Sequence, residues 1–175
     1  AKKTDEWAQY GNPTHPNTTL GPLARIDIKN KLNQQLSSAN ILPDHVVYKQ
    51  PIDAPSGNAF PCMIIDATHL PKTSTVFTEE LFGPVAICDS FTSTDDAILK
   101  ANATPYGLGA SIWTTNSSIM DACTTAIDCG ALAINSTVHT HFDTPFGGRK
   151  KSGLGLELGL EGAHSFTGFK SVLKF

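Results

Sequence analysis

The sequence predicts an α/β domain built on a parallel sheet. Strand-like and helix-like segments alternate between residues 85 and 135, which is the order of βαβ units. The strand-like segments are almost wholly apolar, as expected for a sheet that is covered on both faces. The chain of 175 residues is also long enough for a domain with a hydrophobic core of its own.

Composition and charge exclude several classes of protein. The chain is 40% hydrophobic and 17% charged, with a net charge of -3, as in ordinary globular proteins. No basic run is longer than Arg149-Lys150-Lys151, so nucleic-acid binding is not expected, and no apolar run reaches the roughly 20 residues of a membrane span. The four cysteines form no C-x-x-C pair and the first residues lack a signal-peptide core, so we expect reduced thiols and a cytoplasmic protein.

The first half of the chain is expected to hold one long helix and two short strands. Residues 11–22 contain three prolines and two glycines and are predicted to form a loop. Apolar residues then recur at every fourth position, which predicts an amphipathic helix over residues 22–39 with Pro22 in its first turn. Apolar runs beside proline or glycine at residues 45–48 and 62–65 predict strands.

The second half is expected to alternate between strands and helices and to end in an exposed strand. Thr94 is predicted to cap the first helix, because two aspartates follow it where the helix dipole favours negative charge. Gly130 fits the C′ position of the second helix, which starts at residue 116 or 117. The other predictions are strands over residues 85–88, 109–114, 131–135 and 167–175, a long loop over residues 136–155 and a short helix over residues 156–163.

Two adjacent carboxylates, Glu79 and Glu80, precede the sequence LFGP. A pair of carboxylates can act as an acid and a base. Adjacent residues on a strand point to opposite faces, however, so these two are not expected to share one site. Taken alone, the pair is interpreted as a surface turn with solvated side chains.

The glycine-rich run PFGGRKKSGLGLELG, residues 145–159, matches neither a Walker A loop nor a dinucleotide fingerprint. A glycine-rich loop before a helix can hold a phosphate. We favour the alternative, in which Gly147 and Gly148 allow backbone turns that a Cβ would prevent.

Signatures of a metal site or a nucleophile are incomplete. His139 and His141 form an H-x-H, but only Asp143 lies near them and no third ligand cluster accompanies them, so no metal is predicted. No motif marks an activated serine or cysteine. Cys62 and Cys123 are interpreted as packed side chains.

Several segments together resemble the aldehyde dehydrogenase superfamily. Their order and separations match the family, and the tail EGAHSFTGFKSV resembles its closing segment. The forms GPLAR and KKSG are similar to those of bacterial succinate-semialdehyde dehydrogenases. Asn135 matches a family asparagine that we interpret as structural, whereas Leu156 departs from the arginine that is usual there. The main segments are EELFGPVAI at 79–87, ANATPYGLGASIWTTN at 101–116, GALAIN at 130–135 and PFGGRKKSGLGLELG at 145–159.

The resemblance implies a fold, a reaction and a cofactor. Residues 1–163 would be the C-terminal portion of a three-layer, parallel-sheet catalytic domain, and residues 164–175 an oligomerisation strand. Family enzymes oxidise an aldehyde to the carboxylic acid with NAD or NADP, through a thioester on a cysteine. The nucleophilic cysteine, the glutamate base and the cofactor domain of the family precede the matched segments. We therefore expect no catalytic residue in this chain, and the isolated chain is expected to be inactive.

Position by position, the resemblance assigns roles to five residues. Glu80 matches the glutamate that hydrogen-bonds the nicotinamide ribose hydroxyls, and Phe82 matches an aromatic residue near the nicotinamide. Thr140 and His141 belong to the segment that varies with the substrate, and Phe146 matches an aromatic residue of the substrate tunnel.

The sequence leaves the substrate and the assembly open. A substrate such as succinate semialdehyde needs a cation or hydroxyls for its carboxylate, and Thr140, His141 and Arg149 are available. A homo-oligomer, dimer or tetramer, is expected because the terminal strand would pair with another edge. Two alternatives are a natural non-catalytic module that associates with itself or with a full-length relative, and a phosphate-reductase relative on the same fold.

Overall fold

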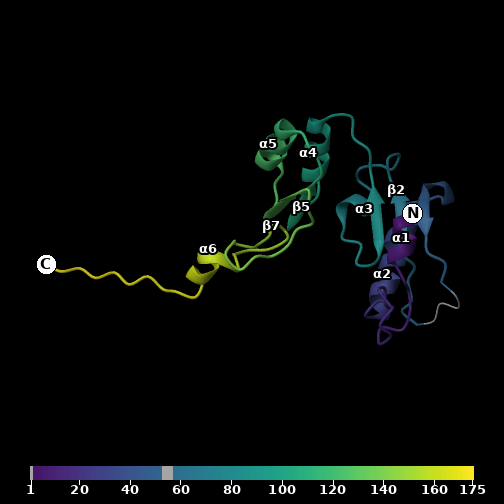
Figure 1. The fold of residues 1–175 in the computed structure, drawn as a ribbon, viewed down its shortest axis with the longest axis horizontal. Coiled ribbons are helices and arrows are strands. Elements are labelled where there is room, and N and C mark those ends of the chain that lie inside the picture. The colour runs from purple at the N-terminus through teal and green to yellow at the C-terminus, as the bar shows by residue number, and fades with distance from the viewer. Residues whose placement is uncertain (1, 53–56) are drawn as a thin grey trace. The chain divides into compact units, whose positions relative to one another are not determined.

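The chain folds into two compact units that both combine helices and strands (Figure 1), in a computed structural model that describes residues 2–52 and 57–175. The first unit ends at Ser90 and the second begins at Phe91. The α/β class predicted from the alternation of segments is therefore confirmed.

The first unit is built on a three-stranded sheet with the order β1-β2-β3. β1 (Val46–Lys49) pairs with β2 (Met63–Asp66) in the antiparallel orientation, and β2 pairs with β3 (Val85–Cys88) in parallel. This sheet is mixed, which corrects the prediction of a parallel sheet. Antiparallel neighbours need no crossover helix, and the described residues between β1 and β2 contain no helix.

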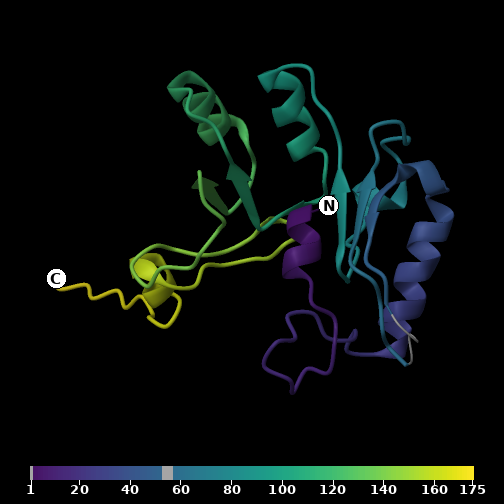
Figure 2. The ribbon, with the colours of Figure 1, turned by 45° about the vertical axis from the view of Figure 1, so that its right-hand side comes forward.

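The long helix α2 (Ile26–Ser38) lies alongside this sheet (Figure 2). It begins four residues later than predicted, because Pro22 is followed by extended chain. The backbone N–H of Leu23 donates to the carbonyl of Asn58 at 3.0 Å, and Arg25 is the N-cap with an extended backbone. The other helical segments of this unit are α1 (Lys2–Trp7), the 3₁₀ turn η1 (Pro43–His45) and the single turn α3 (Thr75–Thr78).

The core of the first unit consists of two adjoining clusters of buried side chains. Leu36, Ile41, Leu81 and Ile87 pack against both clusters and join them. Burial alternates along β3, so one face of this strand is packed and the other is exposed, which corrects the expectation of cover on both faces. The buried members are Leu32, Phe60, Met63 and Ile65 in one cluster and Ala39, Ala67, Leu70 and Val76 in the other.

The second unit contains one of the two βαβ units predicted between residues 85 and 135. β5 (Gly109–Ile112) and β6 (Ala131–Ile134) pair in parallel, and α5 (Ser117–Ala126) connects them. The other predicted unit is not formed, because β3 pairs with β2 in the first unit and not with β5. A second, antiparallel pair joins β4 (Tyr106–Gly107) to β7 (Arg149–Lys150). The strand β7 lies inside the segment that was predicted to be a loop.

The helix ends of the second unit confirm the predicted start of one helix and correct two predicted caps. Asn116 caps α5, because its side-chain oxygen accepts from the N–H groups of residues 118 and 119 at 2.9 and 3.3 Å. Ser93 rather than Thr94 caps α4 (Thr94–Asn102), since the Ser93 hydroxyl accepts from the Asp96 N–H at 3.1 Å. Gly130 is not a C′ glycine, because α5 ends at Ala126.

The C-terminal segment differs from its predicted form. α6 (Gly159–His164) begins three residues late, because Glu157 is bridged to Phe146 and Leu158 has a φ of 62°. The residues after α6 form neither helix nor strand (Figure 1), and their large apolar side chains are exposed. The predicted strand over residues 167–175 is thus not formed within the single chain, and its pairing with a second chain stays a prediction.

Candidate functional site

The segment EELFGP, residues 79–84, leaves α3 in an extended conformation and separates the two glutamates. Glu79 has φ and ψ of -122° and 155°, so the side chains of Glu79 and Glu80 diverge. The Glu79 carboxylate accepts a hydrogen bond from the side-chain amide of Gln35 at 2.7 Å. The same amide donates to the backbone carbonyl of Glu80 at 3.1 Å. Glu79 is therefore tied to α2, in agreement with a structural role.

The carboxylate of Glu80 is left available. Within the part of the chain that the structure describes, it forms no hydrogen bond and no ion pair, and Glu80 is exposed. Phe82, two residues further on, has 61% of its surface exposed. Both side chains line a shallow hollow of about 490 Å³ together with residues 20–24 and Ile28. A free carboxylate can accept hydrogen bonds from hydroxyl groups, and an exposed ring beside it can pack against a planar group.

The end of the EELFGP segment is fixed on the core. A Cβ on Gly83 would overlap a terminal methyl group of the buried Leu32, so a larger residue here would force that core side chain to move. The Gly83 N–H donates to the Leu81 carbonyl at 2.8 Å, and the Met63 N–H donates to the Pro84 carbonyl at 2.9 Å. Phe82 therefore lies on a segment that is held at both ends.

In the second unit, Thr140 and Phe146 line one hollow of about 490 Å³. The structure thus brings together two of the three residues assigned to the substrate pocket. His141 is not among the lining residues, since its ring pairs with the Asp143 carboxylate and stacks on Phe142 with 4.7 Å between ring centroids. The rest of the lining is Leu108, Gly109, Ala110, Ser111 and Val138.

The cations and imidazoles near this hollow have other partners. The Arg149 guanidinium lies 2.6 Å from the Asp128 carboxylate, so Arg149 is held on β7. The His139 ring hydrogen-bonds the Thr137 hydroxyl at 2.8 Å. Among the described residues no group of three His, Cys, Asp or Glu side chains is placed to hold a metal ion.

The glycine-rich run serves close backbone packing. A Cβ on Gly147 would lie 2.5 Å from the Gly155 carbonyl oxygen, and a Cβ on Gly148 would lie 2.6 Å from the carbonyl carbon of Ser152. A Cβ on Gly130 would overlap the carbonyl of Gly147. This confirms the interpretation of Gly147 and Gly148 as positions where a Cβ does not fit.

The four cysteines are all free thiols. Burial raises the pKa of the Cys62 thiol, and burial is also the main reason that the pKa of Cys129 is raised. Both are thus protonated and poor nucleophiles at neutral pH. Cys123 is buried on α5, which confirms its interpretation as a packed side chain, whereas Cys88 is exposed at the end of β3.

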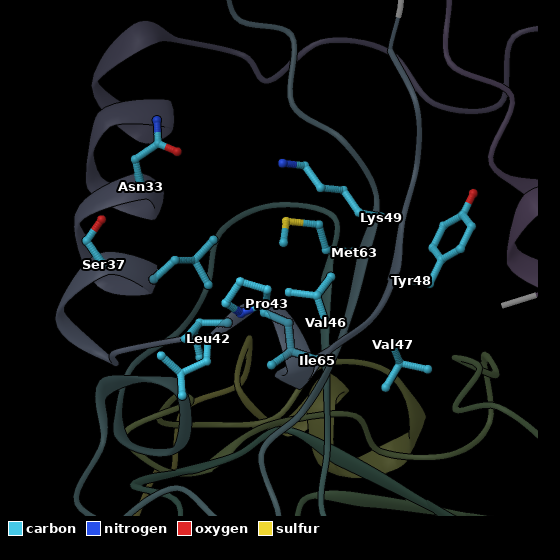
Figure 3. Close-up of a pocket in the computed structure, with 12 residues that line it drawn as sticks. Asn33, Ser37, Leu42, Pro43, Val46, Val47, Tyr48, Lys49, Met63 and Ile65 are labelled. Carbon is cyan, nitrogen blue, oxygen red and sulfur yellow. The ribbon is translucent and has the colours of Figure 1, made fainter.

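A further groove of the first unit contains none of the predicted site residues. It has a volume of about 640 Å³ and lies between α2 and the strands β1 and β2. In Figure 3, Asn33 and Ser37 project from α2, and Lys49 reaches toward them across Met63.

A search of the described helices for a span that could cross a lipid bilayer found none.

Sequence reasoning missed two side chains that organise these sites. Gln35 is only 5% exposed and holds the EELFGP segment, and it lies three positions after Leu32, on the apolar side of α2. A polar residue within an apolar stripe was the signal that could have identified it. Asn102 donates to the Ala126 carbonyl at 2.7 Å and accepts from the Asp128 N–H at 2.8 Å, which fixes the end of α5.

Asn135 has the structural role expected of it. It adopts a φ of 53° directly after β6. Its side-chain amide accepts from the Thr114 N–H and donates to the Thr114 carbonyl, both at 2.9 Å. These two hydrogen bonds fix the end of β5 beside the end of β6.

Comparisons with known proteins identify relatives in sequence and in fold. The NADP(+) succinate-semialdehyde dehydrogenase of Mycobacterium leprae is 38% identical over 95% of this chain, and a probable enzyme of the same kind from Synechocystis is 36% identical over 94%. The structure of an NAD-dependent aldehyde dehydrogenase from Sinorhizobium meliloti superimposes on 97% of the chain with a TM-score of 0.86 and 27% identity.

These relatives are much longer than the present chain. It spans 36% of the Mycobacterium leprae protein and 33% of the Sinorhizobium meliloti chain, or about a third of each. The family model for aldehyde dehydrogenases matches residues 1–172. The chain, with its separated glutamates and its glycine-packed C-terminal unit, therefore belongs to the aldehyde dehydrogenase family.

Proposed function

We propose that this chain carries parts of the cofactor and substrate sites of an aldehyde dehydrogenase that uses NAD or NADP. The parent reaction would be the oxidation of succinate semialdehyde or a similar aldehyde to the carboxylic acid. The observation that carries the proposal is the different environment of the two glutamates. Glu79 is hydrogen-bonded to Gln35, whereas the carboxylate of Glu80 stays available beside Phe82.

The residues of the EELFGP segment fit a nicotinamide cofactor. The Glu80 carboxylate offers acceptor positions for two ribose hydroxyls, and the exposed ring of Phe82 offers a flat apolar surface. When bound, the cofactor would accept the hydride of the aldehyde. The part of the chain described here would bind and orient that cofactor, and it supplies no activated thiol at Cys62 or Cys129.

The substrate side of the proposal is supported by the hollow between Thr140 and Phe146. Its lining is mostly apolar, with the hydroxyl-bearing side chains of Ser111 and Thr140. Because Arg149 is paired with Asp128, hydroxyls rather than this guanidinium would meet the carboxylate of a semialdehyde. The relatives named for succinate semialdehyde support that substrate class.

The cofactor role of Glu80 can be tested on the chain itself. We expect titration with NAD+ to shift the backbone amide signals of residues 80 and 82 in NMR spectra, and E80A to weaken this response about tenfold or more, because a hydrogen bond to a charged group contributes about 1.5–3 kcal/mol. E79Q serves as the control, since Glu79 faces Gln35 and its amide analogue retains an acceptor.

A parallel assay addresses catalysis. The isolated chain should show no turnover of succinate semialdehyde with NAD+ or NADP+, because the expected nucleophile and base are not among its motifs. Clear turnover would contradict the proposal that further residues are required. An equal NAD+ response in the wild-type and E80A chains would contradict the cofactor role of Glu80.

We also propose that the parent assembles as a homo-oligomer, dimer or tetramer, through residues 164–175. The exposed apolar side chains of Phe169, Val172 and Phe175 support this proposal. An apolar segment with unpaired backbone groups favours pairing with the sheet edge of a second chain. Sedimentation should show association of the chain that is lost when residues 165–175 are deleted. An identical monomer before and after the deletion would contradict it.

A further inference from the structure

Gln35 forms hydrogen bonds to both ends of the segment that carries the proposed cofactor residues. Its backbone carbonyl accepts from the Thr75 hydroxyl at 3.0 Å, at the start of α3. Its side-chain amide donates to the Glu79 carboxylate at 2.7 Å and to the Glu80 carbonyl at 3.1 Å, just past the end of α3. One residue of α2 therefore fixes both ends of residues 75–80.

The environment of Gln35 makes these bonds strong constraints. The residue is 5% exposed, so its amide protons have little access to water when the protein partners are removed. One partner is a carboxylate, and hydrogen bonds to charged groups are stronger than neutral ones. The bond to Glu79 also fixes the backbone directly before Glu80, since Glu79 and Glu80 are adjacent in the chain.

We propose that Gln35 is a positioning residue for the cofactor site, which acts by holding the Glu79 carboxylate against α2 so that the carboxylate of Glu80 and the ring of Phe82 are available at the hollow. This inference rests on the proposed cofactor role of Glu80. Gln35 itself is not in the lining of that hollow, so it acts through the segment and not on the ligand.

The test replaces Gln35 and follows the chain by amide hydrogen exchange. In Q35L, exchange at the hydrogen-bonded amides of Glu79 and Gly83 should accelerate about tenfold. The reason is that local opening of the segment no longer has to break the two hydrogen bonds of the Gln35 side chain. Exchange at the core amides of Ile65 and Ile87 should stay as in the wild type. The response of Glu80 to NAD+ should weaken about fivefold.

Three further variants distinguish the proposed role from a general loss of folding. E79L removes the acceptor from the surface side, leaves the core side chain in place, and should loosen the same two amides. E79Q keeps an acceptor oxygen and should behave like the wild type. Q34L is the matched control, because Gln34 is the neighbouring glutamine on α2 and is exposed.

The outcomes separate this inference from the proposed function. Unchanged exchange at Glu79 and Gly83 in both Q35L and E79L would overturn the inference, as would an equal acceleration at Ile65 and Ile87, which marks an ordinary core residue. If the segment loosens locally but E80A leaves the NAD+ response unchanged, the cofactor role of Glu80 fails while the pinning by Gln35 stands.

Discussion

Substitution of Gly130 by alanine is expected to unfold the second unit. The new Cβ would overlap the carbonyl group of Gly147, which is backbone and cannot rotate away. Gly147 has no room to retreat, because its own Cβ position is 2.5 Å from the Gly155 carbonyl oxygen. Overpacking of a close interior usually costs about 1–3 kcal/mol, and a contact between backbone segments belongs at or above the top of that range.

The effect of G130A is measured from the amide NMR signals of β5 and β6 and from urea unfolding. G153A is the control in the same glycine-rich run, since the nearest atom to its Cβ would be 3.9 Å away. It should change the free energy of unfolding by no more than about 0.5 kcal/mol. Preserved β5 and β6 signals in G130A would show that the approach of Gly130 to Gly147 is not required.

Substitution of Ile65 by alanine is expected to be the most damaging change in the first unit. Ile65 is 0% exposed, lies in the middle of the sheet and is paired in register with Ile87 on β3. Removing its side chain leaves a cavity among Leu32, Phe60 and Met63, which usually costs about 2–5 kcal/mol. β3 continues directly from the EELFGP segment, so the NAD+ response of Glu80 should weaken with it.

Urea unfolding of I65A gives the free energy directly. V47A is the matched control, since Val47 is a β-branched residue on the neighbouring strand with 56% of its surface exposed. Its loss should cost less than about 1 kcal/mol. Equal effects of I65A and V47A would contradict the placement of the core between α2 and the sheet.

Local chemistry predicted much of the fold. The helix starts show how far this goes: α5 begins at Ser117, within the predicted start, but the aspartates after Thr94 do not reveal that the hydroxyl of Ser93, one residue earlier, caps α4. Tertiary contacts decided the rest. Pro22 suits a first helical turn, yet the bond of Leu23 to Asn58 keeps this stretch extended, and no local signal reports a partner so far along the chain.

The sites were predictable to a different degree. Glu80 and Phe82 were assigned by resemblance, and the structure adds the physical reason why Glu79 is set apart. His141 is grouped with Thr140 because both lie in the segment that matches the substrate-dependent part of the family, but the His141 ring pairs with Asp143 and does not line the hollow. Hydrogen-bond partners of this kind depend on side-chain directions, which sequence spacing does not specify.

The buried apolar side chains of the described residues lie in the first unit, with the exception of Cys123. Burial of apolar surface is what makes the heat capacity of unfolding large. The stability of the first unit should therefore curve strongly with temperature, and that of the second unit, which depends more on hydrogen bonds and close glycine contacts, should curve less.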